Sequence, residues 1–151
     1  MNENASLFFV DRHVDSHIKE KKAFIEYGSN QKFITYAVLH EQSSKLRHFF
    51  SKFKINREDR VIILMQDVIS YPIIFWGCLK SGVIPVLLNT LLSSEVVNEI
   101  INNSRAKAVF ISSRLLGSFE NSVKKNVSIK HIIEVGTKKS NYINFDEEIQ
   151  K

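Results

Sequence analysis

Four metal-ligand side chains lie close together near the N-terminus: Asp11, His13, Asp15 and His17. On a helix, His13 and His17 would be one turn apart and could share a metal ion, as could Asp11 and Asp15. The two pairs would then occupy opposite faces, and Val14 stands where a His-Glu-x-x-His zinc site requires glutamate. We therefore interpret the cluster as a polar helix face and expect no metal site.

Two further residues have side chains suited to catalysis, but their sequence surroundings favour structural roles. Cys78 could act as a nucleophile only beside a histidine and with access to water, and it lies in the most apolar segment of the chain. Asp67 follows a predicted strand, as a phosphoacceptor would, but the acidic pair of a receiver domain is missing. We expect buried packing for Cys78 and helix capping for Asp67.

The sequence lacks a phosphate-binding loop. Such a loop needs closely spaced glycines so that backbone N–H groups can approach the phosphate oxygens. The glycines, at positions 28, 77, 82, 117 and 136, are far apart, and none begins a Gly-Lys-Ser/Thr sequence. We expect no catalytic, cofactor-binding or metal-binding residue in this chain and no cofactor held by it alone.

Composition indicates one globular domain. The chain has 151 residues, of which 44% are hydrophobic and 25% charged. Its net charge of +5 is spread along the sequence and interleaved with acidic residues, so we expect solvated faces and no nucleic-acid partner. A single cysteine, no secretory signal and no apolar stretch long enough to span a bilayer predict a cytoplasmic protein without a membrane partner.

Hydrophobic periodicity predicts alternating helices and strands. We expect helices over 5–21, from the N-cap Thr35 to 54, 69–81 ending at Gly82, from the N-cap Ser93, and 113–124; strands are expected at 23–27, 32–36, 61–65, 84–88, 108–111 and 131–135. The first two strands read as an antiparallel hairpin turning at 28–31. The fold class is therefore α/β, a three-layer parallel sheet flanked by helices with a small hairpin near the N-terminus.

Several segments resemble, in order, motifs of the adenylate-forming (AMP-binding) acyl- and aryl-CoA ligases. They are Thr35-Tyr-Ala-Val-Leu39, Asn56-Arg-Glu-Asp-Arg-Val61, Ile74-Phe-Trp-Gly-Cys-Leu-Lys-Ser-Gly-Val-Ile-Pro-Val86, Asn89-Thr-Leu-Leu-Ser-Ser-Glu95, Ser104-Arg-Ala-Lys-Ala-Val-Phe-Ile111 and Phe145-Asp-Glu-Glu148. The wording around Pro85 is most similar to the benzoate- and hydroxybenzoate-CoA ligases. Two positions depart from the pattern: Val38 replaces a capping glutamate, and Leu91 replaces an arginine associated with CoA contacts.

This resemblance implies the N-terminal part of the acyl-CoA synthetase fold. Residues 1–151 would form one N-terminal subdomain, with a helix and hairpin in 4–36, an αβ core in 37–135 and a tail in 136–151 that leads to a phosphate loop. The full-length enzyme would convert a carboxylate, ATP and CoA to acyl-CoA, AMP and pyrophosphate, with magnesium. Without the phosphate loop and catalytic lysine of the family, the chain should be inactive by itself.

The expected partners are the remaining subdomains of a parent ligase, or a partner chain, bound through apolar surface that includes Tyr71, Phe75 and Trp76. A homodimer would serve the same purpose. The alternative hypothesis is a free-standing, non-catalytic interaction module derived from a truncated or split ligase. A small nucleic-acid-binding domain is the third and weakest alternative, and it would require salt-sensitive binding to oligonucleotides.

Overall fold

A five-stranded parallel sheet forms the centre of the protein. A computed structural model describes residues 4–28 and 31–150, and the strands follow the order β4-β3-β5-β6-β7. Their bounds are β3 Arg60–Leu64, β4 Ile84–Leu87, β5 Ala108–Ser112, β6 His131–Val135 and β7 Ile143–Asn144. All five residues of β5 are buried, and successive ones face opposite cores, as a strand covered on both sides requires.

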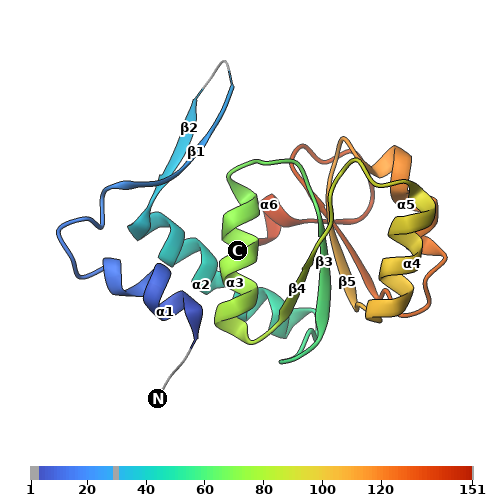
Figure 1. Ribbon diagram of the computed structural model, residues 1–151, viewed down its shortest axis with the longest axis horizontal. Helices are drawn as coiled ribbons and strands as arrows, with labels where there is room; N and C mark the ends of the chain where they lie inside the picture. The colour runs from blue at the N-terminus through green and yellow to red at the C-terminus, as the bar shows by residue number, and fades with distance from the viewer. Residues whose placement is uncertain (1–3, 29–30, 151) are drawn as a thin grey trace.

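Helices cover both faces of this sheet (Figure 1). One face carries α2 (Tyr36–Lys52), α3 (Ser70–Ser81) and α6 (Phe145–Glu148), with α1 (Ala5–Phe9) packed on α3; the other carries α4 (Ser94–Ser104) and α5 (Leu116–Lys124). Phe110 of β5 packs with Phe49 and Phe145 on the first face, and Ile111 belongs to the second core. The predicted three-layer α/β fold is confirmed.

The helix boundaries follow from local chemistry. The Thr35 hydroxyl accepts a hydrogen bond from Val38 N–H, and Ser93 caps Val96 in the same way, as predicted. Gly82 ends α3 with φ of +70°, a left-handed conformation that costs glycine nothing. None of the helices in 4–28 and 31–150 is long and apolar enough to cross a membrane.

The N-terminal hairpin extends from the main body beside the carboxyl ends of the strands (Figure 1). It consists of β1 (Lys22–Glu26) and β2 (Lys32–Thr35), paired antiparallel as predicted, and its predicted turn lies partly outside the described residues. A carboxylate oxygen of Glu26 accepts a hydrogen bond from Ile69 N–H at 3.0 Å, which joins the hairpin to the first turn of α3.

Three predictions about local structure were wrong. The helix expected over 5–21 stops at Phe9, and a 3₁₀ turn (η1, Asp11–His13) follows because Asp11 turns inward to Lys80 and His40. Asp67 does not cap α3: the helix begins after Ile69, whose N–H is bonded by Glu26. The helix expected over 113–124 begins three residues later, at Leu116. The tail, to which no element was assigned from the sequence, forms β7 (Ile143–Asn144) and α6.

Candidate functional site at the carboxyl edge of the sheet

A polar cleft of about 1160 Å³ lies at the carboxyl ends of β3, β5 and β6. The hairpin forms one wall, and the other walls come from the segments 66–70, 112–114 and 135–137 and from Asp146. Parallel α/β sheets bind their ligands at this edge, because the loops that follow adjacent strands converge there. It is therefore the candidate functional site of this fold.

Serine hydroxyls tie the three strand ends together. Gln66 N–H, just after β3, donates to Ser112 Oγ at 3.0 Å, and Ser113 Oγ donates to the carbonyl of Val135 at 3.0 Å. These bonds cross from β3 to β5 and from β5 to β6, so the rim of the cleft is held by the chain itself. Rigid positioning of this kind suits a frame for a binding site.

Asp146 lies in the floor of the cleft, and both of its carboxylate oxygens accept hydrogen bonds. Its two carboxylate oxygens accept hydrogen bonds from Gly136 N–H at 2.6 Å and from Ser70 Oγ at 3.3 Å. Gly136 has φ of +100°, a conformation that residues with a Cβ rarely adopt, and its carbonyl accepts from Asn144 Nδ2. The carboxylate thus links β6, α3 and α6 and has a structural role.

The loop after β6 is organised by a buried carboxylate, that of Glu134. Its oxygens accept hydrogen bonds from Lys139 N–H at 2.9 Å and from the Ser140 N–H and hydroxyl at 3.2 and 2.7 Å. Burial alone would raise the pKa of Glu134, but the hydrogen bonds from Ser140, Ser113 and the backbone lower it. The charged form therefore holds residues 137–140 against the sheet.

Several polar groups are left at the rim of the cleft. Asp67 and Arg114 are exposed, and partial burial, with a smaller effect from the charge of Asp67, raises the pKa of Tyr71. The lining offers a carboxylate, several hydroxyls and the cationic side chains of Arg114, Lys32 and Lys139, all of which can contact a bound ligand. A triphosphate is usually also held by a cradle of backbone N–H groups.

The predicted cluster near the N-terminus is dispersed in the structure. Asp11 Oδ1 lies 2.6 Å from Lys80 Nζ and 2.7 Å from His40 Nδ1, whereas His13 packs on the ring of Tyr36. Burial alone would raise the pKa of Asp11, but the hydrogen bonds from Lys80 and His40 lower it. Across 4–28 and 31–150, no three His, Cys, Asp or Glu side chains are grouped so that they could hold a metal ion.

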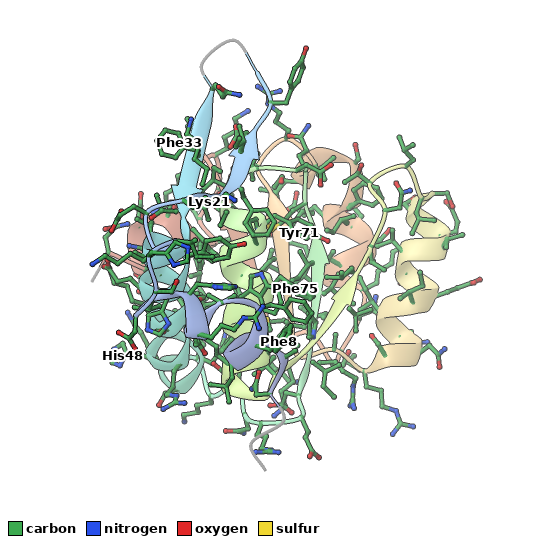
Figure 2. The ribbon with its side chains drawn as sticks, turned by 60° about the vertical axis from the view of Figure 1, so that its left-hand side comes forward. Phe8, Lys21, Phe33, His48, Tyr71 and Phe75 are labelled. Carbon is green, nitrogen blue, oxygen red and sulfur yellow. The ribbon has the colours of Figure 1, made fainter. Side chains whose placement is uncertain are left out.

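Cys78 is fully buried, and burial raises the pKa of its thiol far above the ordinary value, so it packs in the core as expected. The predicted aromatic surface is only partly covered. Tyr71, Phe75 and Trp76 line an apolar groove of about 430 Å³ with Phe24 and Ile25 of the hairpin. Figure 2 shows Tyr71 and Phe75 on one side of α3, and the Phe9 ring of α1 lies 5.9 Å from that of Trp76.

Sequence reasoning missed the residues that organise the cleft: Glu26, Glu134 and Asp146. Only Asp146 carried any signal, since it lies in the Phe145-Asp-Glu-Glu148 segment that resembles a family motif. Glu26 and Asp146 each bond a backbone group beside another element, and Glu134 bonds backbone groups of the loop that follows its own strand. The contacts of Glu26 with Ile69 and of Asp146 with Ser70 join distant parts of the chain and leave no spacing pattern in the sequence.

Comparisons with known proteins agree with this architecture. An anthranilate CoA ligase in complex with anthranoyl-AMP has a similar fold, with a TM-score of 0.87 at 19% identity over 96% of this chain and 27% of that one. A benzoate CoA ligase from Burkholderia xenovorans gives a TM-score of 0.83 at 23% identity over 97% of this chain and 28% of the other. At these identities the likeness establishes the fold.

Relatives found by sequence share a higher percentage of identical residues with this chain than these two solved structures do. The chain is 32% identical over 133 residues to a 4-hydroxybenzoate–CoA/benzoate–CoA ligase of Rhodopseudomonas palustris, covering 88% of this chain and 24% of that protein. It is 26% identical to a long-chain-fatty-acid–CoA ligase of Salmonella typhimurium, covering 93% of the chain and 26% of the relative. The chain thus spans about a quarter of the length of these relatives. The sequence profile of the family described as AMP-binding enzyme matches residues 10–150, and the chain therefore belongs to that family.

Proposed function

We propose that this chain supplies the N-terminal αβ layer of an ATP-dependent, AMP-forming aryl- or acyl-CoA ligase and is not catalytic alone. The main support for this proposal is the cleft at the carboxyl edge of the sheet. Its carboxylate Asp146 and its serines are bonded to the chain itself, and the sequence has no glycine-rich loop to hold a triphosphate. ATP, magnesium and CoA would be bound by the complete ligase, which we expect in the cytoplasm.

The position of α6 supports this proposal. Asp146, in the first turn of α6, lies in the floor of the cleft, so a segment continuing past residue 150 would start close to it. In the family pattern, the segment resembling Phe145-Asp-Glu-Glu148 precedes the phosphate loop. A loop delivered there would face the rigid rim formed by Ser112, Ser113 and Gly136.

The exposed apolar groove between the hairpin and α3 is evidence that this surface binds a partner. Phe24 and Ile25 are 41% and 52% exposed, and Leu87, at the other end of the groove, is 48% exposed. A two-stranded hairpin is marginally stable unless one of its faces is packed. We propose that the remaining subdomains of the ligase cover this groove. The same exposed surface favours the alternative, a free-standing interaction module that binds a partner without catalysis.

A chimera tests the proposal. The matched quarter of the Rhodopseudomonas palustris ligase is replaced by this chain, and benzoate-dependent AMP release is measured for the chimera and for the chain alone. We expect activity from the chimera and none from the chain. A folded but inactive chimera would contradict the ligase proposal, and AMP release by the chain alone would contradict its being non-catalytic.

Two variants of the chimera test the groove. Ile25→Asp places a charge in it, and we expect AMP release to fall at least about tenfold, because a desolvated charge disrupts an apolar interface. Val96→Asp is the matched control, since Val96 is also partly exposed (39%) but lies on α4, on the other side of the sheet. Equal effects of the two variants would contradict the assignment of the groove as the covered surface.

A further inference from the structure

The amino edge of the sheet, opposite the candidate site, carries a concentrated positive charge. Chain segments entering β5 and β6, and the end of α2, meet at this lower end of the sheet in Figure 1. Its cations are Lys52, Lys54, Arg105, Lys107, Lys125 and Lys130, and we call these residues with Val127 the amino-edge patch. Strand register sets their spacing, because Lys107 N–H bonds Arg60 O and Lys130 N–H bonds Lys107 O.

Part of this charge is neutralised within the patch, and part is not. Lys107 pairs with Asp59 at 2.7 Å, and Lys52 pairs with Glu148. Glu58, the other carboxylate near this edge, lies beside Arg57. Lys54, Arg105 and Lys125 are exposed, and no carboxylate partner is described for them in 4–28 or 31–150. Cations at helix C-termini complement the helix dipole, which explains the position of some of these cations. It does not explain the exposed apolar residue of the patch, Val127.

Val127 is the unexpected residue of the patch. It is 90% exposed at the tip of the loop between α5 and β6, with Lys125 on one side and Lys130 on the other. The loop is ordered: Asn126 is buried and its Nδ2 donates to Asn98 Oδ1 at 2.8 Å, and Lys130 Nζ donates to the Val127 carbonyl at 3.0 Å. The fold thus presents an apolar side chain to solvent in a loop that also carries Lys125 and Lys130.

We propose that the amino-edge patch docks on an anionic lipid surface, with Val127 entering the headgroup region and the lysines contacting lipid phosphates and carboxylates. Basic clusters attract anionic leaflets, and a neighbouring apolar side chain adds contact with the acyl boundary. The aromatic residue that lines the hollow beside the patch, Phe53, is partly buried against Phe49 and His131, whereas nucleic-acid binding surfaces stack successive bases on exposed rings. We expected no membrane partner because no segment spans a bilayer, whereas this contact is peripheral.

Cosedimentation with vesicles tests the proposal on the 151-residue chain. We expect binding to phosphatidylcholine vesicles containing roughly 30 mol% phosphatidylserine to exceed binding to pure phosphatidylcholine at least about tenfold, and to weaken as salt is raised. The triple variant Lys54→Glu/Lys125→Glu/Lys130→Glu should lose at least about tenfold in affinity. Val127→Ser, which leaves the charge unchanged, should lose about threefold or more.

A charge-matched control separates the patch from net charge. Lys19→Glu/Lys21→Glu/Lys22→Glu makes the same charge change on exposed residues at the base of the hairpin, and we expect less than about a twofold effect. Circular dichroism melting must show all variants folded. Equal loss in both triple variants, no preference for anionic vesicles, or tighter binding to a single-stranded oligonucleotide than to vesicles would overturn the proposal. The outcome is independent of whether the ligase chimera is active.

Discussion

Gly77 of α3 lies directly against the side chain of Leu46 of α2. A methyl group added at Gly77 would sit 2.6 Å from Leu46 Cδ2 and 2.7 Å from its Cβ, which is closer than carbon atoms pack. Leu46 is fully buried, so it has no open space to move into. The glycine therefore sets how closely the two helices of the first layer approach.

Gly77→Ala should destabilise the protein by about 1–3 kcal/mol, because overpacking displaces α3 from α2. Gly117→Ala is the matched control: an added Cβ there meets no atom within 4 Å, and α5 should gain up to about 1 kcal/mol from the better helix former. Urea unfolding of both variants measures the difference. Equal free energies of unfolding for the two variants would mean that α2 and α3 pack less closely at Gly77 than described.

Acid should weaken the loop beside the cleft through Glu134. Its lowered pKa in the folded state means that the unfolded chain binds the proton more readily, so the stabilisation is complete above about pH 4.5 and is lost as the pH falls through the lowered folded value. Glu134→Gln should cost about 1–3 kcal/mol at pH 7, and less at pH 3. Urea unfolding at several pH values tests this, and a pH-independent cost would be the contrary result.

The buried pair Asp11–Lys80 should show clear energetic coupling. Lys80 Nζ is 2.6 Å from Asp11 Oδ1, with the side chains only 10% and 19% exposed. A double-mutant cycle with Asp11→Ala and Lys80→Ala should give about 1–2 kcal/mol of coupling free energy. The exposed pair Glu41–Lys45, one turn apart on α2, should give about 0.3–0.5 kcal/mol. Similar values for the two pairs would refute the role assigned to Asp11 in docking the N-terminal segment.

Cys78 should resist modification as long as the protein is folded. Its side chain is inaccessible and burial raises the pKa of the thiol, so the reactive thiolate is scarce at neutral pH. Reaction with a thiol reagent at pH 8 should become fast only across the urea unfolding transition. Rapid labelling of the native protein would show that α3 opens locally or that the thiol is exposed.

Local signals predicted most of the fold. Apolar runs located β3, β5 and β6, and Thr35, Ser93 and Gly82 marked helix ends through short-range hydrogen bonds or backbone conformation. The same reasoning failed over 10–21, where a helical stripe is present but Asp11 is drawn to Lys80, 69 residues away in sequence. Tertiary contacts override local propensity there.

The hydrogen bonds that organise the cleft could not be predicted from the sequence for a related reason. Glu26 bonds the first turn of α3 across 43 residues, and Asp146 bonds Ser70 across 76. Neither residue stands in a spacing pattern that indicates its partner. Asp67, which local capping rules favoured for the same role as Glu26, remains at the exposed rim.

We propose that the carboxyl-edge cleft frames a nucleotide site without forming one. Isothermal titration of the folded 151-residue chain with ATP–magnesium, CoA and benzoate tests it most directly. We predict no binding of any of the three at concentrations up to about 1 mM. Binding of ATP or CoA with a Kd of about 10 μM or lower would contradict the account, because the site would then lie within this chain.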